Sequence, residues 1–366
     1  MPPKLLFSLA ILLPLTAQET IWQERMESAR MLVRAGKPQD ARAIVEAVHE
    51  TALTAKDNEA AFESNRMLTY FSRAAGDWPK VEELLNEALD LVPRPDPRMR
   101  SASLLSDLAH ARRAQGRLEE AVATLERAVG MRGRTSLAES ARDFTTIGLL
   151  QLELKKVDDA KSWLMGAVQM WSQLMREDPE VLGALEAMAA LYRDGAEYEN
   201  AEPLYERALR IRETSFGPKS AEMIGGLDNL AYCYFGSRKY DKAEPLYKRL
   251  LELWDATAGP EHPMIALTLD KMVTFYSAQE RFEEAQPLAE RAVQLRGKAL
   301  ADSFRTQAKL AAHRKDTTAA IDLTTKAVQV SDMANIPKPP VRILPAPKNA
   351  IPLIKGKPVK PASDSK

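Results

Sequence analysis

The side chains most often used for catalysis or metal binding are few in this chain, and they are scattered. Its 366 residues include four histidines and one cysteine. No two histidines have the spacing of a helical metal-binding pair, and a single cysteine excludes a disulfide framework and a cysteine-based zinc site. We therefore expect no metal and no cofactor, and we interpret Cys233 as a small buried apolar side chain. The histidines are His49, His110, His262 and His313.

Paired carboxylates recur in the chain, but their pattern is not that of an acid/base dyad. Glu119 and Glu120 occupy the same place in a repeated sequence block as Glu283 and Glu284, which is typical of a solvated helix face. The chain also has no Gly-rich phosphate loop and no Gly-x-Ser-x-Gly elbow. We predict no catalytic residues and hence no enzymatic activity.

The charge of the chain is balanced overall but uneven along its length. Lysine and arginine number 51, as do aspartate and glutamate. Residues 337–366 hold seven of the basic residues and one acid, Asp364, so the rest of the chain is mildly acidic. A nucleic-acid partner is not expected, because such proteins carry a basic face.

The strongest pattern is an internal repeat. Glu197–Leu209, Lys239–Leu251 and Arg281–Val293 align with one another, each with a small residue followed by Glu or Gln and a Pro-Leu pair. Weaker copies extend the pattern to eight units. The small residues are Ala41, Val81, Ala121, Ala160, Ala201, Ala243, Ala285 and Ala320, with spacings of 40, 40, 39, 41, 42, 42 and 35.

Each block has the apolar periodicity of a helix, and another periodic segment precedes it. The sixth unit places Leu227, Leu230 and Tyr234 in the upstream segment. Glycines mark the turn between the two helices, at Gly36, Gly76, Gly116 and Gly195, where a left-handed exit is favoured. The second helices are predicted to begin near residues 38, 78, 118, 157, 198, 240, 282 and 317. The sequence thus predicts an all-α fold of about eight helix hairpins.

This pattern resembles the tetratricopeptide repeat. The length of the later units, together with Gly259-Pro-Glu-His-Pro263, resembles the kinesin-light-chain type. The resemblance implies a right-handed α-solenoid over residues 18–333 that binds a protein or peptide in a concave groove. The unit at Val81 departs from the small-residue pattern, Lys155 replaces a turn glycine, and Thr324 replaces an aromatic residue.

In such solenoids the first helices line the groove, so their outward-facing positions are the candidate partner-binding residues. Asn229 and Lys271 stand where chaperone-binding relatives clamp a peptide carboxylate, but Glu186 and Ala190 replace the matching groups one unit earlier. A complete carboxylate clamp is therefore not expected. The candidates are Arg66, Tyr70, Arg73, Asp107, His110, Arg113, Arg193, Asn229, Tyr232 and Lys271.

The two ends of the chain differ from the repeats. Lys4 and the apolar run Leu5–Leu15 resemble a secretory signal peptide, with cleavage expected after Ala17. The run is too short to span a bilayer, so no membrane span is expected after cleavage; retention as an anchor is the alternative. Residues 334–366 are rich in Pro and Lys, which predicts a disordered tail. That tail either has no role or contacts the envelope weakly.

Two hypotheses for function follow. The first is an exported, non-catalytic scaffold or adaptor, periplasmic or secreted, that binds a partner protein or peptide in the groove. The second is an envelope assembly factor whose basic tail contacts anionic lipid or cell wall. The repeats support binding in general, and the sequence does not name the partner.

Overall fold

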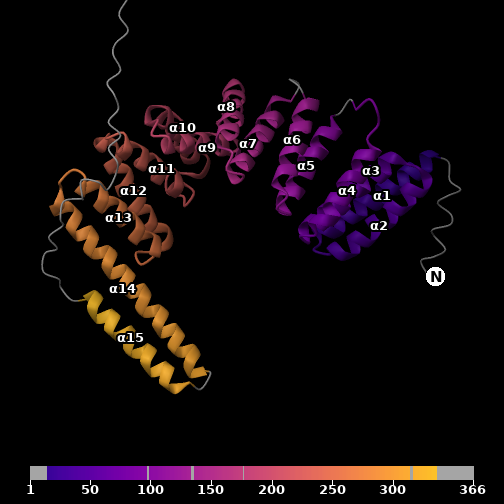
Figure 1. Ribbon diagram of the computed structural model, residues 1–366. Coiled ribbons are helices and arrows are strands. Elements are labelled where there is room, and N and C mark those ends of the chain that lie inside the picture. The colour runs from indigo at the N-terminus through magenta and orange to yellow at the C-terminus, as the bar shows by residue number, and fades with distance from the viewer. Residues whose placement is uncertain (1–14, 97–98, 133–135, 176, 314–315, 336–366) are drawn as a thin grey trace, which may run out of the picture. The chain divides into compact units, whose positions relative to one another are not determined.

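The computed structural model describes residues 15–96, 99–132, 136–175, 177–313 and 316–335, and these parts contain helices and no strands (Figure 1). Most of the predicted signal peptide, residues 1–17, and of the tail, residues 334–366, lies outside the described residues. The helices are α1 (Leu15–Arg34), α2 (Pro38–Ala55), α3 (Asn58–Ala74), α4 (Trp78–Leu91), α5 (Arg100–Ala114), α6 (Leu118–Arg132), α7 (Leu137–Glu153), α8 (Val157–Gln173), a short 3-10 turn (Pro179–Val181), α9 (Leu182–Asp194), α10 (Tyr198–Phe216), α11 (Met223–Gly236), α12 (Tyr240–Ala258), α13 (Pro263–Ser277), α14 (Phe282–His313) and α15 (Thr317–Asn335).

Consecutive helices pack as hairpins, which confirms the predicted all-α repeat fold. The chain forms two compact units, Met1–Leu191 and Tyr192–Lys366. In the first, α1 packs on α2, α3 on α4, α5 on α6 and α7 on α8; in the second, α11 packs on α12, α13 on α14 and α14 on α15. The second helices begin at Pro38, Trp78, Leu118, Val157, Tyr198, Tyr240, Phe282 and Thr317.

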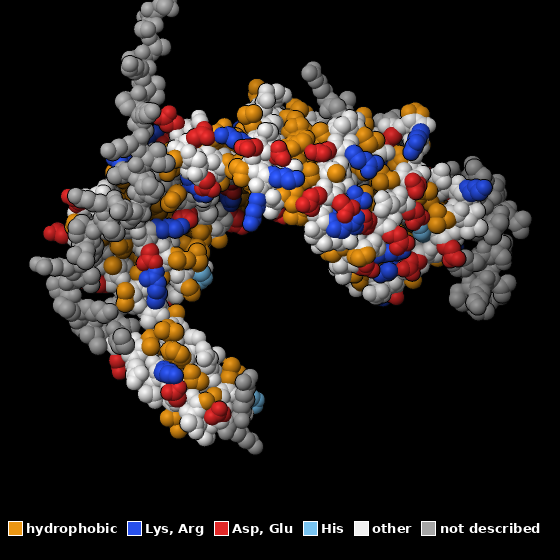
Figure 2. Space-filling view, viewed as in Figure 1, with side chains coloured by type: hydrophobic (Ala, Val, Ile, Leu, Met, Phe, Trp, Pro, Cys, Tyr) orange, Lys and Arg blue, Asp and Glu red, His pale blue; other side chains and the backbone are white. Residues whose placement is uncertain are grey.

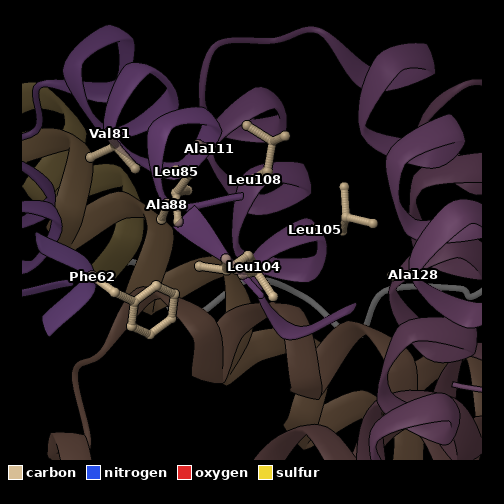
Figure 3. Packing of buried hydrophobic residues seen from close by; sticks show 10 residues of the cluster. Phe62, Val81, Leu85, Ala88, Leu104, Leu105, Leu108, Ala111 and Ala128 are labelled. Carbon is tan, nitrogen blue, oxygen red and sulfur yellow. The ribbon is translucent and has the colours of Figure 1, made fainter. Parts of the chain in front are cut away.

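The small residue of the second helix lies in the buried core in the first seven repeats. Figure 3 shows part of the core of the first compact unit. Phe62 of α3, Leu85 of α4 and Leu104 of α5 belong to one buried cluster there. Val81 fits there despite its larger side chain. The first seven small residues are all 0% exposed: Ala41, Val81, Ala121, Ala160, Ala201, Ala243 and Ala285.

The turn between paired helices has one geometry in the first seven repeats, with a left-handed residue at a fixed place before the small residue. The backbone at Gly76 has φ 71°. Our prediction of Gly195 as the turn residue of the fifth repeat is wrong, because the left-handed residue there is Ala196, with φ 58°. The repeat therefore imposes the turn even where the side chain disfavours it. The same place is held by Gly36, Gly76, Gly116, Lys155, Ala196, Arg238 and Glu280.

A recurring ion pair joins neighbouring repeats. Glu244, directly after Ala243, accepts from Arg281 at 2.6 Å and from the Tyr276 hydroxyl at 3.1 Å, both in the next repeat. Hydrogen bonds from Arg281 and from Lys248 lower the pKa of Glu244 to about 2. The same arrangement, at 2.6 Å in each case, pairs Glu82 with Arg117 and Glu202 with Lys239.

The last repeat differs from the others because its first helix is not separate. The helices α10 and α12 end at Gly217 and Gly259, whose φ values are 88° and 85°. Ala301 stands at the matching place in α14, which continues to His313. The last spacing, 35 residues rather than 42, is short by the length of the missing linker. The lone Gly297 is tolerated inside a helix, so α14 runs through both segments.

The turn geometry predicts opposite effects of exchanging Gly and Ala at one repeat position. Gly76→Ala should destabilise the protein by about 1 kcal/mol, because the left-handed backbone conformation is unfavourable for a residue with a Cβ atom. A Cβ at Gly76 meets no atom within 4 Å, so the cost is in the backbone. Ala196→Gly should stabilise by a similar amount. Urea unfolding monitored by circular dichroism measures both, and two shifts of the same sign would contradict this account.

The ion pair between repeats predicts a pH-dependent contribution to stability. Glu244→Gln should lower the free energy of unfolding at pH 7 by about 1–2 kcal/mol, because charge-assisted hydrogen bonds are lost. A depressed carboxyl pKa stabilises the fold above the unfolded value of 4.5. This contribution is lost as the pH falls from 4.5 towards 2.

The difference between wild type and Glu244→Gln should therefore shrink as urea unfolding is repeated from pH 7 down to pH 3. The exposed Glu283→Gln is the matched control and should change stability little at either pH. A difference that stayed constant with pH would show that the Glu244 charge does not stabilise the fold.

Candidate partner-binding groove

The first helices of the repeats carry the predicted partner-binding residues, and repeat geometry sets their positions. Tyr70, His110 and Tyr232 stand at one place relative to the small residue of their unit, and Arg73, Arg113 and Arg193 stand at another. Each place is one helical turn from the next, so the side chains form a stripe along each first helix. Asn229 and Lys271 share a third place, and Arg66 lies one residue before it in its own unit.

In the first compact unit, Met1–Leu191, four predicted residues line one cleft of about 560 Å³ between α3 and α5. Arg66, Tyr70 and Arg73 come from successive turns of α3, and Asp107 faces them from α5. Tyr70 is 55% exposed. Its ring meets Phe71 edge-on, with centroids 5.6 Å apart. The cleft therefore presents an aromatic side chain to solvent beside a rim of charged groups.

The bottom of this cleft is apolar, a feature that the sequence analysis missed. Phe62 and Leu104 line it, and both are buried. The Arg100 guanidinium lies 4.6 Å above the centre of the Phe62 ring, and it binds the Glu59 carboxylate at 2.9 and 3.0 Å. The helical periodicity marks Phe62 and Leu104 as core residues, so nothing in the sequence indicated that they border a cleft.

The cations of the cleft are neutralised by acids of the same surface. Arg73 donates to Asp107 at 3.2 Å, and Arg66 donates to Glu63 at 3.1 Å. On the face visible in Figure 2, basic and acidic side chains are interspersed over α3 to α6. The cleft is thus electrically balanced. A ligand carboxylate would have to displace an acid that is already paired.

His110 and Arg113 continue the stripe on α5. Arg113 pairs with Glu153 of α7. The His110 side chain is exposed, but neighbouring atoms partly desolvate it and thereby lower its pKa; the charges of Arg73 and Arg113 lower this pKa further, against the opposing effect of Asp107.

In the second compact unit, Tyr192–Lys366, Arg193 contacts two other predicted residues. Arg193 donates to the side-chain oxygen of Asn229 at 3.2 Å, and its guanidinium lies 5.6 Å from the centre of the Tyr232 ring. Lys271 is held by Asp228 at 2.6 Å. Asn229 and Lys271 are thus both engaged by neighbours.

The structure places His262 and Cys233 in local roles. His262 caps α13 by accepting from the Met264 N–H at 3.3 Å, and its ring stacks on Trp254 at 4.9 Å. Cys233 is a buried free thiol, and burial raises its pKa to about 11. Within the described ranges, no three His, Cys, Asp or Glu side chains gather as metal ligands would, and no helix has the length and apolar character to cross a bilayer.

Comparison with known proteins identifies the repeat. Tetratricopeptide repeat family models match residues 104–139, 181–222 and 222–298. A search of curated proteins found no match.

Several solved structures are similar to this chain. The crystal structure of BtubC (BKLC) from P. vanneervenii is 22% identical, with a TM-score of 0.50 over 65% of this chain and 92% of that one. A putative kinesin light chain with nearly identical TPR-like repeats from Podosopora anserina is 19% identical, with a TM-score of 0.44 over 54% of this chain and 96% of that one. A tetratricopeptide repeat protein from Parabacteroides merdae is 18% identical, with a TM-score of 0.45 over 75% of this chain and 98% of that one.

The matched models cover units in both halves of the chain, and the helix hairpins, small-residue contacts and turns agree with them. The chain therefore contains tetratricopeptide repeats over residues 104–139 and 181–298.

Proposed function

We propose that this protein is a non-catalytic scaffold or adaptor that binds an extended segment of a partner protein along its first helices. The cleft between α3 and α5 is the observation that carries the proposal. It combines an apolar bottom, at Phe62 and Leu104, with the exposed ring of Tyr70. Partly buried aromatic side chains beside apolar pockets are the groups that anchor peptide segments most strongly.

The paired charges of the cleft limit which side chains of a partner it can bind. Because Arg66, Arg73 and Arg100 are each paired with an acid, the anchor is an apolar or aromatic side chain and not a carboxylate. The paired charges on the rim are suited to neutral backbone amides and polar side chains. Binding of this kind should depend weakly on salt, since few net charges are screened.

Export is the second part of the proposal. The basic start, short apolar run and small residue at Ala17 support secretion and a periplasmic or extracellular location. A scaffold in that location would meet partner segments outside the cytoplasm. The alternative is an envelope assembly factor, and the basic composition of residues 337–366 supports it.

Tyr70→Ala should weaken peptide binding about tenfold or more, because the exposed aromatic anchor is removed. The probe is a set of peptides selected from a random displayed library on the wild-type protein, with affinity then measured by fluorescence anisotropy. Tyr70→Phe should retain binding. Met165→Ala, an equally exposed apolar change on α8, should leave affinity unchanged. Loss of affinity in Met165→Ala with none in Tyr70→Ala would place the site elsewhere.

Deleting residues 337–366 separates the two functional hypotheses. In the scaffold proposal, the selected peptides bind the shortened protein as before. In the alternative, co-sedimentation with vesicles rich in anionic lipid falls on deletion, because charge attraction near the surface is about 1 kcal/mol for each basic residue. Peptide binding lost together with the tail would contradict the groove as the binding site.

A further inference from the structure

The end of the repeat array carries a contact surface that nothing in the described chain covers. In the sixth and seventh repeats, Met223 and Ile265 stand at one place before the small residue, and both are 0% exposed. Leu300 stands at the same place before Ala320, yet it is 48% exposed. A position that packs against the preceding repeat elsewhere is therefore on the surface here.

A second position shows the same change. Cys233 and Phe275 are both 0% exposed, whereas Leu310, at the matching place, is 53% exposed. The Phe275 ring lies 5.5 Å from that of Tyr247 in the preceding repeat, which identifies this as an inter-repeat contact. Leu300 and Leu310 thus lie on the face of the eighth hairpin that should meet the seventh repeat.

The seventh repeat has the complementary exposed surface. Val293 of α14 is 45% exposed, whereas Leu209, at the matching place in α10, is 8% exposed. Ala320, the last small residue, is only partly buried although the seven before it are completely buried. Both sides of the contact between repeats seven and eight are present in the chain, and the contact is not made.

The cause is the missing linker. Because α14 is one helix from Phe282 to His313, its distal half carries α15 away from the surface where an eighth repeat would stack (Figure 1). Figure 2 shows hydrophobic side chains exposed over this part of the molecule. In the earlier repeats a linker at this place lets the chain turn back, but here Ala301 follows Leu300 directly. The last spacing is accordingly 35 and not 42 residues.

We propose that a second copy of this chain covers this surface by reciprocal exchange. The distal half of α14 and α15 of one protomer stack on the seventh repeat of its partner, and the partner does the same. Exchange of an identical element closes a two-fold dimer, and hinges too short to fold back favour it over the monomer. The new contact continues the same stacking that joins repeats six and seven, and it buries Leu300, Leu310 and Val293 in both copies.

The cross-linking test uses Ala289→Cys together with Leu310→Cys in the full-length chain. Ala289 stands where Tyr247 contacts Phe275, so the exchanged dimer brings residue 289 of one copy beside residue 310 of the other. Within one continuous helix these residues are about 31 Å apart, at 1.5 Å per residue. A short bis-maleimide reagent should therefore yield a covalent dimer. An intramolecular cross-link would show fold-back in the monomer, and either that result or no cross-link would overturn the proposal.

The oligomeric state, measured by light scattering and native mass spectrometry across a dilution series, gives an independent test. Leu300→Asp with Leu310→Asp should weaken the dimer about a hundredfold or more, since apolar burial is lost on both sides. Helicity should not change because both side chains are exposed in the protomer. The matched control is Ile321→Asp on α15, where the side chain is 68% exposed, and it should remain dimeric.

Inserting a copy of residues 259–265 after Leu300 supplies the missing linker and restores the spacing of the earlier repeats. This variant should be a monomer, because the eighth hairpin then stacks on its own seventh repeat. A monomeric wild-type protein, a dimer that Ile321→Asp disrupts while the leucine changes do not, or a dimeric insertion variant would each overturn the exchange. None of these results depends on whether the groove binds peptides.

Discussion

Each helix hairpin of this protein buries its apolar side chains only against its immediate neighbours, so the fold depends on how closely successive helices approach. The small residue of the second helix sets that distance, and it is completely buried in the first seven repeats. A recurrent ion pair from the next residue to the following repeat, as in Glu244 and Arg281, adds a polar contact at the same boundary. Stability is consequently distributed along the array and not concentrated in one core.

This packing leaves the outward-facing side chains of the first helices available for the binding that we propose. Their inward-facing residues and the second helices carry the packing, so the outward stripe that includes Tyr70 and Arg73 can vary without cost to the fold. The stripe still has internal order, because Arg73 pairs with Asp107 and Arg193 with Asn229 across neighbouring repeats. In the proposed scaffold, such pairs would hold the side chains in place before a partner binds, which would reduce the entropy lost on binding.

The same dependence on neighbours makes the last repeat an exception. An interior repeat has a neighbour on each side, whereas the eighth hairpin is held away from the seventh by the uninterrupted α14. Its apolar residues Leu300 and Leu310 consequently lie on the surface. In an array of this kind, a change of a few residues in a linker alters which surfaces meet, although the helices themselves persist.

The sequence alone determined the hairpins and the starts of their second helices, because apolar periodicity and the repeated small residue are local signals read within one or two turns. It also marked the outward positions of the first helices, including Tyr70. Only the tertiary structure decided that Phe62 and Leu104 border a cleft, that Ala196 and not Gly195 takes the left-handed turn, and that α14 continues through the eighth unit. These features depend on the distances between packed helices and on contacts between side chains that are far apart in the sequence. A local sequence pattern does not specify such contacts.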